Sequence, residues 1–242
     1  MANKVKMIDI HSHILPGIDD GAKTLTDSIK MIQFLKSQGV TDIIATPHYI
    51  HESSYTSTCT HNWALLCALK QALATAGISI DLYLGNEIYI DNHIVPLITS
   101  RKAYTLAGSR YLLVELPMSG EFANYEEVLR TLMARGYRVI LAHPERYVSI
   151  QNNFELIRRL HHFGILLQCN LGSITGQYGA HAKDTIIKLA KQKMIFAFGS
   201  DIHRAPTSWS LSSVTTELKK YYTDRELTQL LITNPSNIIN RQ

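Results

Sequence analysis

Two histidines separated by one residue, His11 and His13, end the first apolar run of the chain. On an extended strand, side chains two residues apart point to the same face, so both imidazoles can reach one point beyond the strand. A Pro-Gly pair then forces a turn that brings Asp19 and Asp20 within reach of that point. Imidazoles and carboxylates are ligands of divalent metals, so this stretch predicts a metal site. Two surface histidines after a core strand would give the same short pattern.

Histidines, acidic residues and one asparagine follow the later apolar runs of the chain. They are His48, Glu87, Glu115, His143, Asn170, Asp201 and His203. Because the carboxyl ends of parallel strands in a barrel converge on one face, we expect these side chains to lie together there. Each one alone is compatible with a turn residue or a hydrogen-bonded core histidine. Their recurrence after successive strands favours one shared site.

The elements that would position these side chains alternate between strand and helix. Strands are predicted at 5–10, 40–45, 78–84, 111–114, 137–142, 165–169 and 195–198, and helices at 25–38, 63–76, 125–134, 154–163, 181–192, 211–221 and 224–232. This alternation with short links indicates a parallel sheet with right-handed crossovers. About seven strand–helix units favour an α/β barrel over an open sheet. No repeat or linker interrupts the pattern, so we expect a single domain over 1–242.

Composition narrows the class of protein. Of the 242 residues, 45% are hydrophobic and 18% are charged, which is typical of a compact enzyme. The net charge of +4 is dispersed and forms no basic tract, so we expect no nucleic-acid partner. No apolar run has the length of a transmembrane helix or a signal-peptide core. Three widely spaced cysteines without a C-x-x-C pair predict a reduced, cytoplasmic protein.

The ligand types restrict the chemistry of the predicted site. Imidazoles and carboxylates without a thiolate suit manganese, iron or zinc, and several carboxylates indicate more than one ion. Paired ions of this kind recur in enzymes that displace an oxygen at phosphorus. A cysteine-dependent phosphatase is excluded, because it needs an arginine six residues after its cysteine. Those positions are Leu65, Leu73 and Thr175.

Seven short motifs occur in order along the chain. They are His11-Ser-His13, Asp19-Asp-Gly21, Thr46-Pro-His48, Gly85-Asn-Glu-Ile-Tyr89, His143-Pro-Glu-Arg-Tyr147, Asn170-Leu-Gly-Ser173 and Ser200-Asp-Ile-His203. Together they resemble the polymerase-and-histidinol-phosphatase (PHP) superfamily. Within it they are most similar to the bacterial manganese-dependent protein-tyrosine phosphatases encoded with capsule and exopolysaccharide genes. The similarity runs from about residue 7 to residue 237.

The resemblance implies a distorted (β/α)7 barrel of the PHP type with three metal ions, manganese being favoured and iron or zinc being alternatives. One ion would be bound by His11, His13, Glu87 and Asp201. Glu87 would bridge to a second ion, which Glu115 and His143 also bind. Asp20, His48 and His203 would bind the third ion.

The resemblance also identifies residues for the substrate. Arg146 matches a family arginine that grips the substrate phosphate, and its guanidinium offers a bidentate fork for this. A second family arginine falls at Ser208 in this chain, and Arg204 is its candidate replacement. The long polar stretch 49–62 is predicted to be a lid or a substrate loop. The other six histidines of the chain are expected to be structural or exposed: His51, His61, His93, His161, His162 and His181.

The activity that the resemblance implies is hydrolysis of phosphotyrosine on a protein, the partner being a bacterial tyrosine kinase that controls capsule or exopolysaccharide synthesis. Two alternatives remain open. One is a small-molecule phosphomonoesterase such as histidinol-phosphate phosphatase. The other is a non-catalytic module that binds a kinase and keeps metals only for stability. A metal-dependent amidohydrolase also opens with His-x-His, but Glu87 and Glu115 stand where it commonly has a modified lysine.

Overall fold

The computed structural model describes residues 6–118 and 125–239. The strands in these ranges are β1 (Met7–Ser12), β2 (Val40–Ala45), β3 (His48–Tyr49), β4 (Asp81–Leu84), β5 (Glu87–Tyr89), β6 (Tyr111–Glu115), β7 (Arg138–Ala142), β8 (Leu166–Asn170) and β9 (Ala197–Gly199). The α-helices are α1 (Leu25–Gln38), α2 (Cys59–Thr75), α3 (Ile94–Thr99), α4 (Glu126–Ala134), α5 (Val148–Asn152), α6 (Glu155–His162), α7 (Leu171–Ile174), α8 (Ala180–Lys191), α9 (Leu211–Leu218), α10 (Asp224–Thr228) and α11 (Asn234–Ile239). Shorter helical turns are η1 (Leu106–Gly108), η3 (Pro144–Arg146) and η4 (Gln229–Thr233).

The strands form two parallel sheets that continue into each other. One sheet has the order β1-β2-β4, and the other has the order β3-β5-β6-β7-β8-β9. Two-residue breaks separate β2 from β3 and β4 from β5, so each of these pairs is one interrupted strand. The amide of Gly85 donates to Ala45 O (2.8 Å) and that of Glu87 donates to Pro47 O (3.2 Å), which carries the ladder across both breaks. Counted in this way, the described residues supply seven strand positions.

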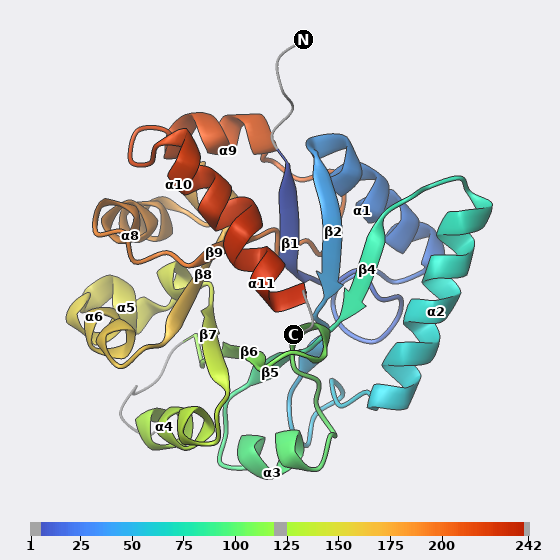
Figure 1. The fold of residues 1–242 in the computed structure, drawn as a ribbon, viewed down its shortest axis with the longest axis horizontal. Coiled ribbons are helices and arrows are strands. Elements are labelled where there is room, and N and C mark those ends of the chain that lie inside the picture. The colour runs from blue at the N-terminus through green and yellow to red at the C-terminus, as the bar shows by residue number, and fades with distance from the viewer. Residues whose placement is uncertain (1–5, 119–124, 240–242) are drawn as a thin grey trace.

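Backbone hydrogen bonds also join the first strand to the last. The amide of Asp201 donates to His11 O (2.8 Å), and the amide of His13 donates to Ile202 O (3.1 Å). The sheet therefore curls until β1 lies beside the end of β9, with helices around its outer face (Figure 1). The prediction of an α/β barrel of parallel strands is confirmed.

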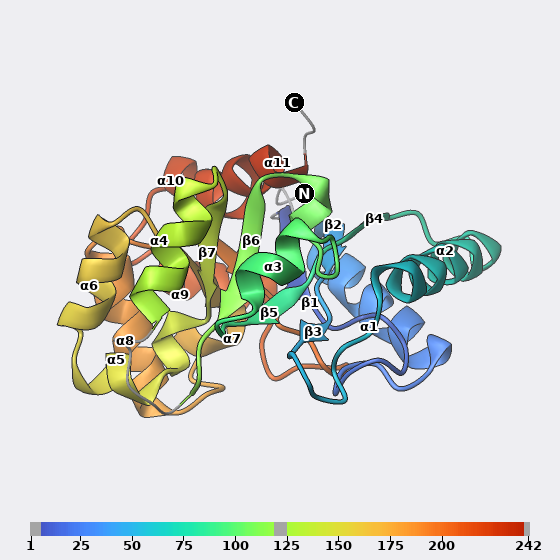
Figure 2. The same cartoon turned by 90° about the horizontal axis from the view of Figure 1, so that it is seen from below.

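Alternation along the strands separates an outer from an inner layer of side chains. Leu112 and Val114 of β6 pack outward with the buried residues of the surrounding helices, whereas Leu113 between them packs inward. The inner apolar cluster holds Ile8, Ile10, Ile44, Leu113, Ile140, Ala142 and Ala197. Ile238 of α11 joins this cluster, and α11 lies at the end of the sheet opposite β3 and β5 (Figure 2). The carboxyl ends of the strands are thus left for polar side chains.

Several element boundaries differ from those predicted. The helix α2 begins at Cys59 rather than at Trp63, because Thr58 caps it by accepting a hydrogen bond from the amide of His61 (3.2 Å). The predicted polar loop 49–62 is therefore shorter, and its first residue belongs to β3. The last helical region continues to Ile239, past the predicted end at 232. No helix within the described ranges combines the length and the apolar character that crossing a bilayer requires.

Candidate metal centre

A local irregularity in β1 turns the side chains of His11 and His13 toward the interior at the carboxyl end of the strand. Ile8 and Ile10 face the inner cluster, so simple alternation would next turn Ser12 inward. The register of β1 against β2 shifts between Asp9 and Ser12. Such irregularities re-aim side chains, and here His11 and His13 become fully buried at the carboxyl end of the strand. Their imidazole Nε2 atoms lie 3.2 Å apart.

Two carboxylates complete a compact group around these imidazoles. Glu87 Oε2 lies 3.3 Å from His11 Nε2 and 3.4 Å from His13 Nε2. Asp201 Oδ1 lies 3.4 Å from each of the same nitrogen atoms. A tetrahedron with metal–ligand bonds of about 2.0–2.1 Å has edges of about 3.3–3.4 Å, so these separations suit one ion. The four residues are those that the resemblance assigns to the first ion.

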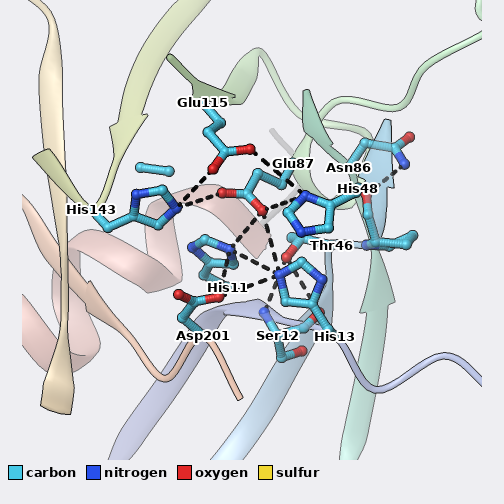
Figure 3. Close-up of polar contacts among 12 residues, drawn as sticks. His11, Ser12, His13, Thr46, His48, Asn86, Glu87, Glu115, His143 and Asp201 are labelled. Atoms are coloured by element: carbon cyan, nitrogen blue, oxygen red, sulfur yellow. Dashed lines mark hydrogen bonds and ion pairs between the residues drawn. The ribbon is translucent and has the colours of Figure 1, made fainter. Parts of the chain in front are cut away.

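The carboxylate of Glu87 lies at the middle of the site. Its Oε1 atom is 2.8 Å from His143 Nε2, and its Oε2 atom is 2.9 Å from His48 Nδ1. Glu115 approaches the same two imidazoles, at 3.7 Å from His143 Nε2 and 3.8 Å from His48 Nδ1. Figure 3 shows the Glu87 carboxylate between His143 and His48. The two oxygen atoms of Glu87 therefore face different sets of ligands, as a bridging carboxylate requires.

A third group lies nearer the surface. Asp20 Oδ1 is 3.2 Å from His203 Nε2 and 3.4 Å from His48 Nε2. His13 can contribute to the same group, whose ligand atoms all lie within 4.8 Å of one another. The Asp20 side chain is 52% exposed, whereas the Glu87 side chain is fully buried. The structure thus brings all nine predicted metal ligands into one continuous cluster, buried at one end and open at the other.

Unsatisfied polar atoms in this cluster fit the binding of cations. Glu87 Oε2 and His48 Nδ1 are buried and face each other, yet neither makes a hydrogen bond. His143 Nδ1 is likewise buried without a hydrogen-bond partner. Buried polar atoms of native proteins are normally satisfied, and a carboxylate oxygen surrounded by imidazole nitrogens would be satisfied by a bound ion. The donor set of nitrogen and oxygen atoms suits a divalent transition metal.

Electrostatics among these side chains is dominated by the buried carboxylates. Burial opposes the protonation of His48, but Glu87 and Asp20 outweigh it and raise its pKa to about 10. Burial and the negative charge of Glu87 raise the pKa of Glu115 to about 7. Burial alone would raise the pKa of Asp201, but the neighbouring histidines outweigh it and hold that pKa far below its ordinary value. The carboxylates of the cluster therefore attract cations. Binding of a cation would displace the protons that these side chains carry in its absence.

A further layer of side chains orients the imidazoles. His11 Nδ1 donates to Gln168 Oε1 (2.7 Å), while Gln168 Nε2 donates to Asn170 Oδ1 (2.9 Å) and so fixes the amide orientation. His13 Nδ1 donates to Asp19 Oδ2 (2.8 Å). With the proton held on Nδ1, the lone pair of each Nε2 atom faces the cluster. Asn170, predicted at a strand end, contacts the cluster through its Nδ2 atom, which donates to Asp201 Oδ2 (2.6 Å).

Backbone strain marks two of the proposed ligands. His143 and Asp201 adopt positive φ angles of 33° and 49°, which are unusual for residues with a side chain. Each follows the end of a strand, β7 or β9, and the left-handed backbone turns its side chain toward Glu87 or His11. Strain of this kind costs about 1–3 kcal/mol and persists where the surroundings impose it, often at functional sites.

The two predicted substrate arginines lie in different surroundings. Arg146 Nη1 donates to Asp201 Oδ2 (2.8 Å), and its guanidinium lies 4.5 Å from the centre of the Tyr178 ring. Its side chain keeps 27% of its surface exposed, so other donors of the guanidinium remain accessible beside the cluster. Arg204 is exposed and makes no ion pair within the described parts of the chain. Tyr178 and Gln168 were not predicted as site residues, because nothing local in the sequence links them to the ligands. Asp19 was predicted within reach of the site, and it contacts His13 rather than joining the nine proposed ligands.

Comparisons with known proteins agree with this geometry. The family model described as "Capsular polysaccharide synthesis, CpsB/CapC" matches residues 7–240. A putative tyrosine-protein phosphatase, CapC of Staphylococcus aureus, is 33% identical over 91% of this chain and 84% of its own length. The tyrosine-protein phosphatase YwqE of Bacillus subtilis is 32% identical over 83% of this chain and 79% of its own length.

Solved structures give the same result. The crystal structures of YwqE from Bacillus subtilis and CpsB from Streptococcus pneumoniae, described as unique metal-dependent tyrosine phosphatases, match with a TM-score of 0.89 at 29% identity. That match covers 96% of this chain and 94% of the other. A phosphotriesterase homology protein from Escherichia coli, with a TM-score of 0.61 at 14% identity, shares the fold. The resemblance predicted from the motifs is confirmed, and the chain belongs to the CpsB/CapC family of capsular polysaccharide synthesis proteins.

Proposed function

We propose that this chain is a metal-dependent protein-tyrosine phosphatase. The observation that carries the proposal is the continuous cluster of imidazoles and carboxylates around Glu87, with Arg146 directly beside it. Such a cluster can bind cations that attract a phosphate dianion, and the arginine supplies hydrogen bonds for its oxygens. Family relatives are named tyrosine-protein phosphatases, which supports phosphotyrosine as the group hydrolysed.

The proposed ligands divide among three divalent ions, manganese being favoured and iron or zinc being alternatives. The first ion would be held by His11, His13, Glu87 and Asp201. The second would be held by Glu87, Glu115 and His143, and the third by Asp20, His48 and His203. Such ions lower the pKa of bound water and offset the negative charge of the phosphoryl group. Three divalent ions among the four carboxylates would leave a net charge of about +2, which attracts a phosphate dianion.

Arg146 is the proposed contact for the substrate phosphate. One of its terminal nitrogens is held by Asp201, and the ring of Tyr178 supports the face of the guanidinium. The planar fork is thereby oriented before substrate arrives, which lowers the entropy lost on binding. Its fixed positive charge stabilises the charge on the phosphoryl oxygens during displacement. Arg204, which is exposed, stays the candidate replacement for the second family arginine.

The openness of one end of the cluster supports a protein substrate. Asp20 is 52% exposed and His203 is 28% exposed, so the third group lies at the surface. A phosphotyrosine ring can reach such a site while the rest of its protein stays outside. A phenolate is a good leaving group, with an ordinary pKa near 10, so a strong general acid is not required.

The partner that we propose is a bacterial tyrosine kinase that controls capsule or exopolysaccharide synthesis, in line with the description of the family. Both proteins would meet in the cytoplasm. The three cysteines, which form no disulfide among the described residues, fit that reducing compartment.

A comparison of substrates tests the proposal. The purified protein with manganese is given a phosphotyrosine peptide, the matching phosphoserine peptide, and histidinol phosphate. The proposal predicts the highest kcat/KM for the phosphotyrosine peptide. Preference for histidinol phosphate would instead identify a small-molecule phosphatase, and no turnover of any substrate would favour a binding module.

A further inference from the structure

A second group of metal-binding side chains lies outside the cluster described above. It consists of His51, Asp91 and His93, and one ligand atom from each lies within 4.8 Å of the others. Asp91 Oδ2 is 3.9 Å from His51 Nδ1, and Asp91 Oδ1 is 3.8 Å from His93 Nδ1. The sequence predicted His51 and His93 as surface or structural residues, and they are 42 positions apart in the chain.

Pairing between two short strands brings these residues together. Strands β3 and β5 run parallel, with His48 beside Glu87 and Tyr49 beside Ile88. His51 lies three residues beyond His48, and Asp91 lies four residues beyond Glu87. His51 and Asp91 lie just past the ends of these strands, and at no more than about 3.3 Å per residue they are within roughly 10–13 Å of the His48–Glu87 pair. The second group is therefore at the rim of the proposed active site and shares no ligand with it.

The three side chains are partly arranged for a common ligand. Asp91 Oδ1 accepts a hydrogen bond from the amide of His93 (2.7 Å), which fixes the carboxylate. The imidazole rings of His51 and His93 are stacked, with centres 4.4 Å apart and planes inclined by 29°. Both Nδ1 atoms face Asp91. Closing the nitrogen–oxygen distances by about 0.5 Å would give the edge of a tetrahedral site with bonds near 2.0–2.1 Å.

We propose that His51, Asp91 and His93 bind one divalent ion of the zinc class at this rim. Two imidazoles and one carboxylate suit zinc, cobalt or copper, whereas magnesium and calcium prefer oxygen ligands throughout. Three protein ligands leave a fourth coordination position for water or another ligand. The side chains of His51, Asp91 and His93 are 25%, 30% and 60% exposed, so an ion reaches the site directly from solvent.

An ion at this site would fasten the segment after β3 to the end of β5. That segment carries Tyr55, whose ring stacks on the imidazole of His48 at 5.7 Å between centres. His48 is one of the ligands proposed for the active site. The rim ion therefore holds in place a loop that packs on His48 through Tyr55, without contacting the reacting groups.

Counting bound zinc tests this site without relying on activity. Wild type, His93→Ala, His51→Ala and the control His61→Ala are dialysed against the same buffered zinc solution, and zinc per chain is measured by elemental analysis. His61 is an exposed histidine on α2 outside both groups, so its variant controls for the loss of a surface imidazole. We expect wild type and His61→Ala to hold one zinc more than His93→Ala and His51→Ala.

Hydrogen exchange provides the second readout. Zinc should slow amide exchange in residues 50–57 of wild type by at least tenfold, and it should not do so in His93→Ala. The melting temperature of His93→Ala without zinc should match that of wild type, since its side chain is mostly exposed. Equal zinc counts in all four proteins, or an equal loss in His61→Ala, would overturn the proposal. Because neither readout measures turnover, failure here leaves the proposed phosphatase activity standing.

Discussion

Gly199, at the end of β9, is a position where one added methyl group should disturb the metal centre directly. A Cβ atom built there would lie 2.6 Å from His11 Cβ and 2.9 Å from Gln168 Nε2. Ordinary contacts begin at 3.4 Å, so His11 must move by about 0.8 Å in Gly199→Ala. The same methyl group also pushes on the amide that orients the His11 imidazole.

The expected loss follows from the size of this displacement. Misplacing a group at the reacting centre by about 1 Å can lower the rate about 100-fold, or about 2.7 kcal/mol. Inserting a methyl group into a packed core costs about 1–3 kcal/mol of stability. We therefore predict that Gly199→Ala loses about 100-fold in kcat/KM for a phosphotyrosine peptide with manganese, and that its melting temperature falls by a few degrees.

Gly77→Ala is the matched control. Gly77 has a φ of +68°, and nothing lies within 4 Å of an added Cβ atom, so only backbone strain of about 1–2 kcal/mol is expected. This variant should lose stability to a similar extent and keep its activity. If Gly199→Ala keeps full activity at a temperature where it is folded, the tight placement of His11 is not needed for turnover and the reasoning is wrong.

Three further predictions concern substrate, metal and pH. Arg146→Lys keeps a positive charge without the planar fork, so we expect kcat/KM to fall about 10- to 100-fold with unchanged metal content; an unchanged kcat/KM in steady-state assays would remove Arg146 from phosphate binding. Gln168→Leu removes the acceptor for His11 Nδ1 and should weaken manganese binding about 10- to 100-fold in calorimetric titrations, whereas wild-type affinity would show that this contact is dispensable. In protein stripped of metal, His48 with a pKa of about 10 and Glu115 with a pKa of about 7 must lose protons to bind an ion. Manganese affinity should therefore fall as the pH drops from about 9 to 6, with protons released on binding, and a flat pH dependence would contradict this.

The residues of the cluster around Glu87 could be predicted from the sequence alone, because a strand that ends in a histidine or a carboxylate is visible locally. His143 and Glu115 are such cases: each follows an apolar run whose end is clear. The barrel was also predicted from the sequence, because predicted strands and helices alternate along the chain. What local patterns missed was the short strands β3 and β5, which are too brief to show a periodicity of their own.

Contacts between distant parts of the chain were also out of reach. Gln168 orients His11 although the two residues are 157 positions apart. The residues beside Gln168 are apolar, so nothing in the local sequence distinguishes it from a residue of the core. His51 and His93 lie close together because β3 pairs with β5. Neither segment alone indicates the register of that pairing. The side chains of the proposed metal cluster were thus predictable from residue type and strand ends, whereas those that position them required the tertiary structure.

In the proposed function, the cluster around Glu87 holds divalent ions that the hydrolysis of phosphotyrosine requires. The most direct test strips the purified protein of metal, measures hydrolysis of a phosphotyrosine peptide, and repeats the assay after manganese is added. His143→Ala, which removes a buried ligand beside Glu87, and His162→Ala, which removes an exposed histidine of α6, are assayed in parallel. We predict no turnover without metal, recovery with manganese in wild type and His162→Ala, and no recovery in folded His143→Ala. Turnover by the stripped protein, or near wild-type activity of His143→Ala, would contradict the claim.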